Sequence, residues 1–224
     1  MNIKLITFAS SDWCKFKSRW DTQLKNIHEY FYFNEKTLND PDFNKIISES
    51  NNGENLVTKR GFYHYIWKPI LLYKELKNLE DKYDLLVYAD AGCSFNKDII
   101  DSINKDIKLF SESNKIIAAT NDVVNNNFVC TQPFKDKYKP DIHFLFEYPH
   151  YQATFLFLKH DALNLLLDWK NIMLEDYYDV INQPYTTFNN GGDQIYLIWL
   201  LYTKYKNKVF NIQQYPGLIT RIRG

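Results

Sequence analysis

The chain has 224 residues, a length that fits a single domain, and we expect one domain over residues 1–224. Its 27 basic and 27 acidic residues cancel, so no overall field would gather nucleic acid or an anionic membrane onto the protein. The three cysteines, Cys14, Cys93 and Cys130, include no Cys-x-x-Cys pair, which argues against a disulfide framework and a structural zinc site. A reducing compartment is therefore expected.

Two features of the sequence bear on location. A strand-like run over residues 3–8 begins almost at the first residue, and we expect no signal peptide there. The longest apolar stretch, residues 195–202, is far shorter than the roughly 18 residues that a spanning helix needs. These features predict a cytoplasmic protein, at most peripheral to the inner membrane.

Predicted strands and helices alternate in the first part of the chain. Residues 3–8 are a strand, residues 16–27 repeat apolar side chains at helical spacing, and residues 30–33 are a second strand. A capped helix with proline in its first turn follows over about residues 41–47, and another begins around Pro69 and ends near residue 81.

The alternation continues through the middle of the chain. Residues 85–89 are an almost continuous apolar run, typical of a central strand covered on both faces, and residues 116–119 resemble a further strand. Residues 121–139, which are rich in asparagine, are expected to form a long connecting loop.

The last part of the chain repeats the pattern. Residues 155–158 predict a buried strand, Asp161 is a candidate cap for the helix that follows, and Gly192 opens a last apolar helix before a strand at 209–212. This order favours an α/β fold with a mostly parallel sheet flanked by helices, in which ligands bind outside the carboxyl ends of the strands.

Two segments carry most of the functional signal. The first, Gly61-Phe62-Tyr63-His64-Tyr65-Ile66-Trp67-Lys68-Pro69, is an aromatic-rich loop leading into a helix, and the second, Leu85-Leu86-Val87-Tyr88-Ala89-Asp90-Ala91-Gly92-Cys93, is a buried strand ending on a carboxylate. They resemble segments of bacterial GT-A-fold glycosyltransferases that build surface polysaccharide, capsule or lipopolysaccharide. The later Tyr151-Gln152-Ala153-Thr154 and Gly192-Asp193-Gln194 stand in a similar order, so the resemblance covers about residues 3–213.

The resemblance implies a nucleotide diphosphate sugar at the end of the sheet, with an Asp-x-Asp motif that binds Mn²⁺ or Mg²⁺ between the phosphates. A leaving nucleoside diphosphate develops negative charge, which a metal ion or fixed cations must stabilise. Here Asp90 is followed by Ala91 and Gly92, so the second carboxylate is missing. Asp90 is thus a candidate metal ligand, a ligand for a sugar or ribose hydroxyl, or only a cap in the turn. Gly92 provides either close approach of a ligand or a positive φ.

Other candidates for donor binding surround Asp90. The resemblance implies that the nucleoside lies at the end of the first strand, by Thr7, Ala9 and Ser10, and that Gln152 and the Asp193-Gln194 pair face the donor or acceptor. Asp193 is a candidate catalytic base, a sugar ligand or a helix cap, and its position at a helix start predicts a lowered pKa. Arg60 and Lys68 are candidates to neutralise the diphosphate, as is Lys59 unless it is only solvated. The donor-binding set is Thr7, Ala9, Ser10, Arg60, Lys68, Asp90, Ala91, Gly92, Gln152 and Gln194.

Aromatic and histidine residues are less specific. Tyr63, Tyr65 and Trp67 form either a stacking platform for a sugar or base, or part of the core. His143 and His150 lack the spacing of zinc ligands, so a zinc site is not favoured.

The sequence therefore predicts transfer of a sugar from a UDP-, GDP- or CMP-type donor to a hydroxyl of a glycan or lipid-linked acceptor. Two alternatives remain: a nucleotidyl or phosphoryl transferase on the same sheet, though without a P-loop motif, and a non-catalytic carbohydrate-binding protein that has lost the second carboxylate.

Overall fold

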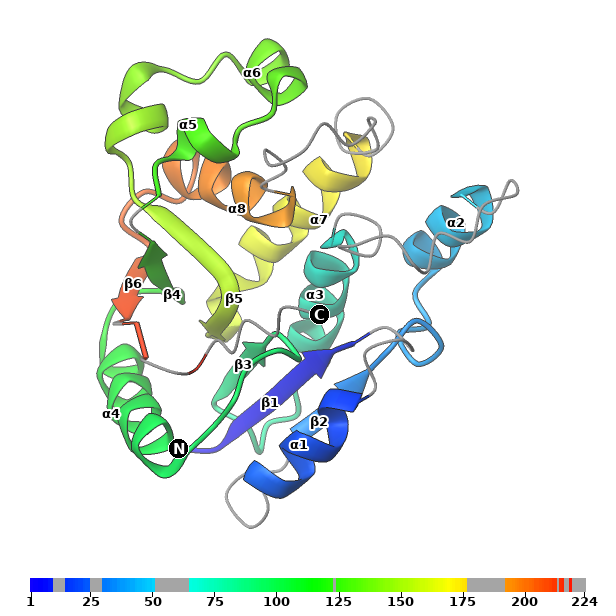
Figure 1. Ribbon diagram of the computed structural model, residues 1–224, viewed down its shortest axis with the longest axis vertical. Helices are drawn as coiled ribbons and strands as arrows, with labels where there is room; N and C mark the ends of the chain where they lie inside the picture. The colour runs from blue at the N-terminus through cyan, green and yellow to red at the C-terminus, as the bar shows by residue number, and fades with distance from the viewer. Residues whose placement is uncertain are drawn as a thin grey trace.

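One mixed sheet forms the centre of the protein. The computed structural model describes residues 1–9, 15–24, 30–50, 65–122, 124–176, 192–212, 214–215 and 218. Within these ranges the strands follow the order β2-β1-β3-β5-β4-β6 (Figure 1). Their bounds are Ile3–Phe8 for β1, Tyr30–Phe33 for β2, Leu85–Ala89 for β3, Ile117–Asp122 for β4, His150–Leu158 for β5 and Val209–Ile212 for β6.

Strand direction decides which residues meet at the site. β1 is parallel to β2 and β3, and β4 is parallel to β6, whereas β5 runs antiparallel to both β3 and β4. The sheet is therefore mostly parallel, as predicted. Because β5 is reversed, its first residues lie at the edge where β3 and β4 end.

Helices cover both faces of this sheet. They are α1 Lys15–Gln23, α2 Pro41–Ser50, α3 Trp67–Lys77, α4 Lys97–Glu112, α5 Asn126–Val129, α6 Gln132–Tyr138, α7 Leu163–Glu175 and α8 Gly192–Thr203, with a π turn at His143–Glu147 and a 3-10 turn at His160–Ala162. Buried residues of α3, α7 and α8 pack on one face, and those of α1 and α4 pack on the other. The alternating side chains of β3 supply both cores: Leu86 and Tyr88 face α3, while Val87 and Ala89 face α4.

The predicted loop at 121–139 is wrong. β4 continues to Asp122, and α5 and α6 follow within the same stretch. The Asn125 side chain accepts a hydrogen bond from Phe128 N and the Thr131 hydroxyl accepts one from Phe134 N, so the polar residues that suggested a loop are helix caps. We call residues 124–149 the insert; it contains α5, α6 and the π turn, and it joins β4 to β5 (Figure 1).

Other elements also differ from what the sequence predicted. β5 begins at His150, five residues before the predicted strand, and α4 was not expected. α7 begins after a 3-10 turn with Ala162 at its cap position and no side-chain cap, so Asp161 does not cap it. The helix at Trp67 ends at Lys77 rather than near residue 81.

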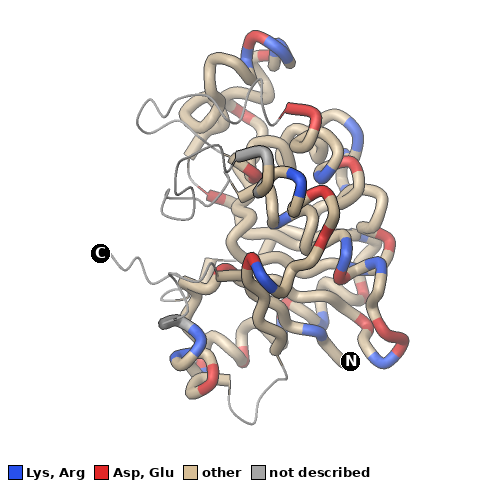
Figure 2. Tube along the Cα trace, turned by 90° about the vertical axis from the view of Figure 1, so that its right-hand side faces the viewer, with Lys and Arg blue, Asp and Glu red and all other residues tan. Residues whose placement is uncertain are grey.

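Charged residues of both signs are mixed along the chain. Figure 2 shows basic and acidic residues interspersed along the described chain, consistent with a net charge of zero. Among the described residues, none of the helices combines the length and the apolar character required to cross a membrane.

Candidate active site

Lys68 joins the two carboxylates for which the sequence predicts catalytic roles. It stands in the first turn of α3, Asp90 directly follows β3, and Asp193 lies in the first turn of α8. The Nζ atom of Lys68 is 2.9 Å from Asp193 Oδ2 and 3.2 Å from Asp90 Oδ1, and it donates to the Ala153 carbonyl oxygen at 3.1 Å. The ammonium group thus makes one hydrogen bond to the backbone and an ion pair with each carboxylate. We call Lys68, Asp90 and Asp193 the charge triad.

The charge triad is open to solvent mainly at Asp90. Lys68 is 2% exposed and Asp193 is 3% exposed, whereas the Asp90 side chain is 32% exposed. Asp90 Oδ1 also accepts a hydrogen bond from the Tyr88 hydroxyl. Oδ2 of Asp90 has no hydrogen-bond partner within the part of the chain that the structure describes. Asp90 is therefore the member of the charge triad that presents an acceptor oxygen at the sheet edge.

Within the charge triad, burial and neighbouring charges shift the pKa values in opposite directions. Burial raises the pKa of Asp193 to about 6, and the neighbouring Lys68 ammonium limits that rise. This corrects the expectation that the helix start lowers the pKa of Asp193, because desolvation outweighs the helix dipole at so buried a position. At Lys68, burial acts to lower the pKa, but the attraction of Asp193 and Asp90 outweighs it and the pKa rises. At pH 7 the charge triad is therefore one positive and two negative charges.

Aromatic rings surround the ammonium group. Nζ of Lys68 lies 5.3 Å from the centre of the Tyr65 ring, 5.7 Å from that of Trp67 and 5.3 Å from that of Tyr88, within the range of cation–π attraction. Trp67 is 4% exposed and stacks on Phe8 with 4.0 Å between ring centroids. Trp67 thus occupies the core, one of the two roles considered for it.

The ends of β1 and β3 come together beside the charge triad. Ala9, Ala91 and Tyr32 pack against one another. Thr7 is 1% exposed, and its hydroxyl oxygen has no hydrogen-bond partner among the described residues. Gly92 has no positive φ, and among the described residues a Cβ atom added there would meet nothing within 4 Å. Of its two predicted roles, the structure excludes the positive φ, and close approach of a ligand stays a prediction.

The first residues of β5 lie on the side of β3 away from β1, next to the end of β4. The Gln152 amide donates to Asp122 Oδ2 at 2.8 Å, so Gln152 faces the end of β4. Asp122 is a strand-end carboxylate that sequence reasoning missed, because residues 121–139 were expected to form a loop. The signal was present: Asp122 follows the apolar run at 117–119 much as Asp90 follows β3. Gln194 lies half-buried next to Asp193 in α8.

Several candidates lie outside the described residues or away from the site. Ser10, Lys59, Arg60 and Tyr63 fall outside the described ranges. His150 is buried against the side chain of Asn126, at 2.9 Å from Oδ1, and burial lowers its pKa. His150 therefore has a structural role where β5 begins, against Asn126 of the insert. No group of three or more His, Cys, Asp or Glu side chains that could hold a metal ion occurs among the described residues.

Arg19 is a second residue that sequence reasoning missed. Its Nη2 atom donates to the carbonyl oxygens of Ala91 at 3.0 Å and Cys93 at 2.7 Å. These two carbonyls flank Gly92 in the turn after Asp90. The only sequence signal was a basic residue in the helix after the first strand, which does not distinguish Arg19 from Lys15 or Lys17.

The described residues do not fit the divalent cation that the Asp-x-Asp resemblance implies. The position of the second carboxylate is Gly92, and Oδ1 of Asp90 already accepts a hydrogen bond from Tyr88 and is paired with the Lys68 ammonium group. An ammonium group 3.2 Å from Asp90 would also repel a second cation at the same oxygen. We therefore assign no step of the chemistry to a metal ion.

Comparison with solved structures identifies the fold. No protein-family model and no curated protein matches the chain. Mouse xyloside xylosyltransferase 1 is similar in structure, with a TM-score of 0.52 and 10% sequence identity over 95% of this chain and 85% of that one. A glycosyltransferase involved in glycosylation of the major capsid of PBCV-1 has a TM-score of 0.47 with 12% identity over 96% and 83%, and galactosyltransferase LgtC, solved with donor and acceptor sugar analogues, has 0.46 with 12% identity over 93% and 72%. The predicted α/β, GT-A-like fold is confirmed.

Proposed function

We propose that the protein is a glycosyltransferase that moves a sugar from a nucleotide diphosphate sugar to a hydroxyl group of a glycan or lipid-linked glycan. One observation carries this proposal: on a GT-A-like sheet, Asp90 is held at the end of β3 with one oxygen bound to Lys68 and Tyr88 and the other free of protein partners among the described residues. In open α/β sheets, ligands bind at this edge.

Asp90 is the residue that we expect to contact the donor. Its Oδ2 atom is suited to accept a hydrogen bond from a hydroxyl of the donor sugar or ribose. Tyr88 fixes the carboxylate from the other side, and burial, followed by the charge of Asp90, keeps the pKa of Tyr88 well above its ordinary value, so the hydroxyl remains a donor. Asp90 is thereby held in one orientation before the substrate arrives, which lowers the cost of ordering it in the transition state.

Lys68 and Asp193 act on Asp90 rather than on the substrate. Nζ of Lys68 lies within 3.2 Å of three protein oxygens, and Asp193 is almost fully buried beside it. We therefore propose Lys68 and Asp193 as positioning residues, in place of direct contact with the diphosphate or the acceptor. During transfer the bond from the anomeric carbon to the diphosphate oxygen breaks and its electron pair leaves with the nucleoside diphosphate. The acceptor oxygen bonds to that carbon, and its proton passes to water.

The end of β1 supports a nucleoside position. Thr7 has a buried hydroxyl without a partner among the described residues, next to the Ala9 and Ala91 contact. Small side chains leave room for a base and ribose. A role in surface polysaccharide synthesis on the cytoplasmic side of a membrane rests on the sequence resemblance, and the free, buried Cys93 and Cys130 suit a reducing compartment.

Ligand-induced thermal stabilisation tests this function. We expect UDP or GDP at about 100 times its dissociation constant to stabilise the protein by about 2.7 kcal/mol. For a chain of this size that is a rise of about 5–10 °C in Tm. Incubation with the matching sugar nucleotide should then release the free nucleotide.

The Asp90→Asn variant separates the candidate functions. It keeps the size of the side chain, and we expect it to lose at least about 100-fold in kcat while Tm changes little, because Asp90 is partly exposed. If neither nucleotide raises Tm, the proposal fails. Binding without release of nucleotide would favour a non-catalytic carbohydrate-binding protein, and release of sugar 1-phosphate in place of the free nucleoside diphosphate would favour a nucleotidyl transferase.

A further inference from the structure

The proposed donor poses an electrostatic problem for this site. With both carboxylates ionised, the charge triad carries one net negative charge, and a diphosphate brought to Asp90 adds more of the same sign. The described residues do not fit a divalent cation at this edge, since Gly92 stands where a second carboxylate would be. Another fixed positive charge is therefore needed close to the turn that follows Asp90.

Arg19 provides such a charge at that turn. Its guanidinium group is hydrogen-bonded to the carbonyl oxygens of Ala91 and Cys93, one on each side of Gly92. The Arg19 side chain is only partly buried. Arginine stays charged under all ordinary conditions, and its planar group matches phosphate oxygens in a way that an ammonium group does not.

α1 is anchored so that Arg19 is held in place. On the side of the turn, Trp20 Nε1 donates to the Cys93 carbonyl oxygen at 3.0 Å, and Gln23 bonds both the Ser94 hydroxyl at 2.8 Å and Phe95 N at 2.9 Å.

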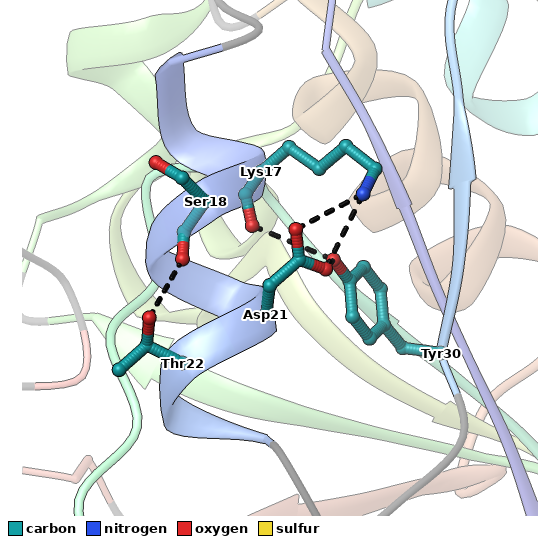
Figure 3. A network of polar contacts seen from close by, with 5 residues as sticks. All are labelled: Lys17, Ser18, Asp21, Thr22 and Tyr30. Carbon is teal, nitrogen blue, oxygen red and sulfur yellow. Dashed lines mark hydrogen bonds and ion pairs between the residues drawn. The ribbon is translucent and has the colours of Figure 1, made fainter.

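The opposite side of α1 is attached to β2. There the Tyr30 hydroxyl donates to Asp21, which also accepts from Lys17 at 3.0 Å (Figure 3). Contacts on both sides fix the helix before a ligand binds, so little ordering cost remains to be met on binding.

Small groups line the turn among the described residues. Within that part of the chain a Cβ atom at Gly92 would contact nothing within 4 Å, and Ala9 and Ala91 carry only methyl groups at the adjoining strand ends. We propose that Arg19 supplies the positive charge for the donor's diphosphate at residues 91–93, in a site that binds this group without a divalent cation. This inference rests on the proposed function and names the part of the site that holds its leaving group.

Equilibrium binding of UDP, GDP and inorganic pyrophosphate tests the inference. In the wild-type protein we expect affinities in EDTA and in Mn²⁺ to agree within about twofold. Arg19→Gln should weaken binding of all three probes by at least about tenfold, the typical effect of losing a charge-assisted hydrogen bond. Arg19→Lys, which keeps the charge but loses the planar geometry, should lie between the two.

Gln23→Leu is the matched control. It removes another α1 side chain from the same turn without changing charge, and we expect affinity within about threefold of wild type. Equal losses in Gln23→Leu and Arg19→Gln would mean that Arg19 only supports the turn, and would overturn the assignment. Binding that requires Mn²⁺ would overturn it as well and leave the glycosyltransferase proposal intact. If no probe binds under either condition, both proposals fail.

Discussion

At the scale of single residues, Lys68 determines what Asp90 and Asp193 can do. A buried ion pair contributes little net stability, because desolvation offsets the attraction, but removing one partner leaves an uncompensated charge. Lys68 meets both carboxylates in a space lined by aromatic rings. It therefore orients Asp90 toward solvent and keeps Asp193 in the interior, which is a positioning role.

The raised pKa of Asp193 predicts how stability depends on pH. Its folded-state pKa of about 6 lies above the ordinary value of 3.8, so the folded protein holds this proton more tightly than the unfolded chain does. The stabilisation from protonated Asp193 is present below about pH 4 and is lost as pH rises to about 6. The free energy of unfolding of the wild type relative to Asp193→Asn should fall by about 3 kcal/mol over that range, measured by urea denaturation at each pH.

Comparing the wild type with Asp193→Asn cancels the contributions that the other carboxyl groups make to the pH dependence of stability. Asp141 is one of these groups, and its hydrogen bonds with Phe144 and Tyr202 lower its pKa. If Asp193 also positions Asp90 for catalysis, kcat/KM of the wild type should decline below about pH 6. A difference in stability that stays flat with pH would contradict the balance of burial and charge at Asp193.

Gly92 is a position at which a second carboxylate can be introduced. Its backbone has no positive φ, and an added Cβ atom would meet none of the described residues within 4 Å, so Gly92→Asp tests the effect of that carboxylate. We expect this variant to bind Mn²⁺ at least about tenfold more tightly than wild type, because two carboxylates with a solvent-facing oxygen form a better site for a hard cation. Electron paramagnetic resonance of free Mn²⁺ measures the binding.

Gly92→Asn is the control for this change, since it has the same size and no charge. It should bind Mn²⁺ no better than wild type. Equal Mn²⁺ binding by the two variants and the wild type would show that a carboxylate at position 92 does not improve metal binding at this site.

At the scale of elements, the insert depends on one buried amide. Asn126 is 0% exposed; its Nδ2 donates to the carbonyl oxygens of Phe144 at 2.8 Å and Tyr148 at 3.0 Å, and its Oδ1 pairs with His150. The amide therefore joins the start of α5 to the π turn and to the first residue of β5.

Replacing that amide should loosen the insert. We expect Asn126→Ala to lower the free energy of unfolding by about 2–4 kcal/mol, because it leaves buried carbonyl groups and His150 without their partner. Asn127→Ala is the control: Asn127 accepts from Lys135 at 2.8 Å in a partly buried setting, and its loss should cost less than about 1 kcal/mol. Chemical denaturation of both variants measures the difference, and equal effects would contradict the anchoring role of Asn126.

The elements that sequence predicted best are those whose pattern is local. β3 is a continuous apolar run, and α8 begins at a glycine followed by a carboxylate, so both were expected where they occur. α5 and α6 were missed because their asparagine and threonine residues are also typical of loops, and only the hydrogen bonds from Phe128 N and Phe134 N identify them as caps. α4 was missed although Asn96 caps it and Ile99, Ile103 and Ile107 share one buried face.

At the scale of the whole molecule, the sequence predicted where Asp90 lies in the fold but not which side chains surround it. Asp90 follows a buried strand, as expected, and so lies at an edge of the sheet. That Lys68 bridges Asp90 to Asp193 depends on the packing of α3 against β3 and α8, which no local pattern contains. The same is true of Arg19, whose partners are backbone carbonyls that have no signature in sequence.

The reversed direction of β5 has a consequence for how such a protein can diversify. β3 and β4 pass through the core before they reach the sheet edge where Asp90 lies. β5 runs in the opposite direction, so it begins at that edge and then passes through the core. The insert that precedes it can thus be exchanged or lengthened while Leu156 and Leu158 keep the strand in register. Under the proposed function, changes in this segment would alter which acceptor is used and would leave the residues around Asp90 unchanged.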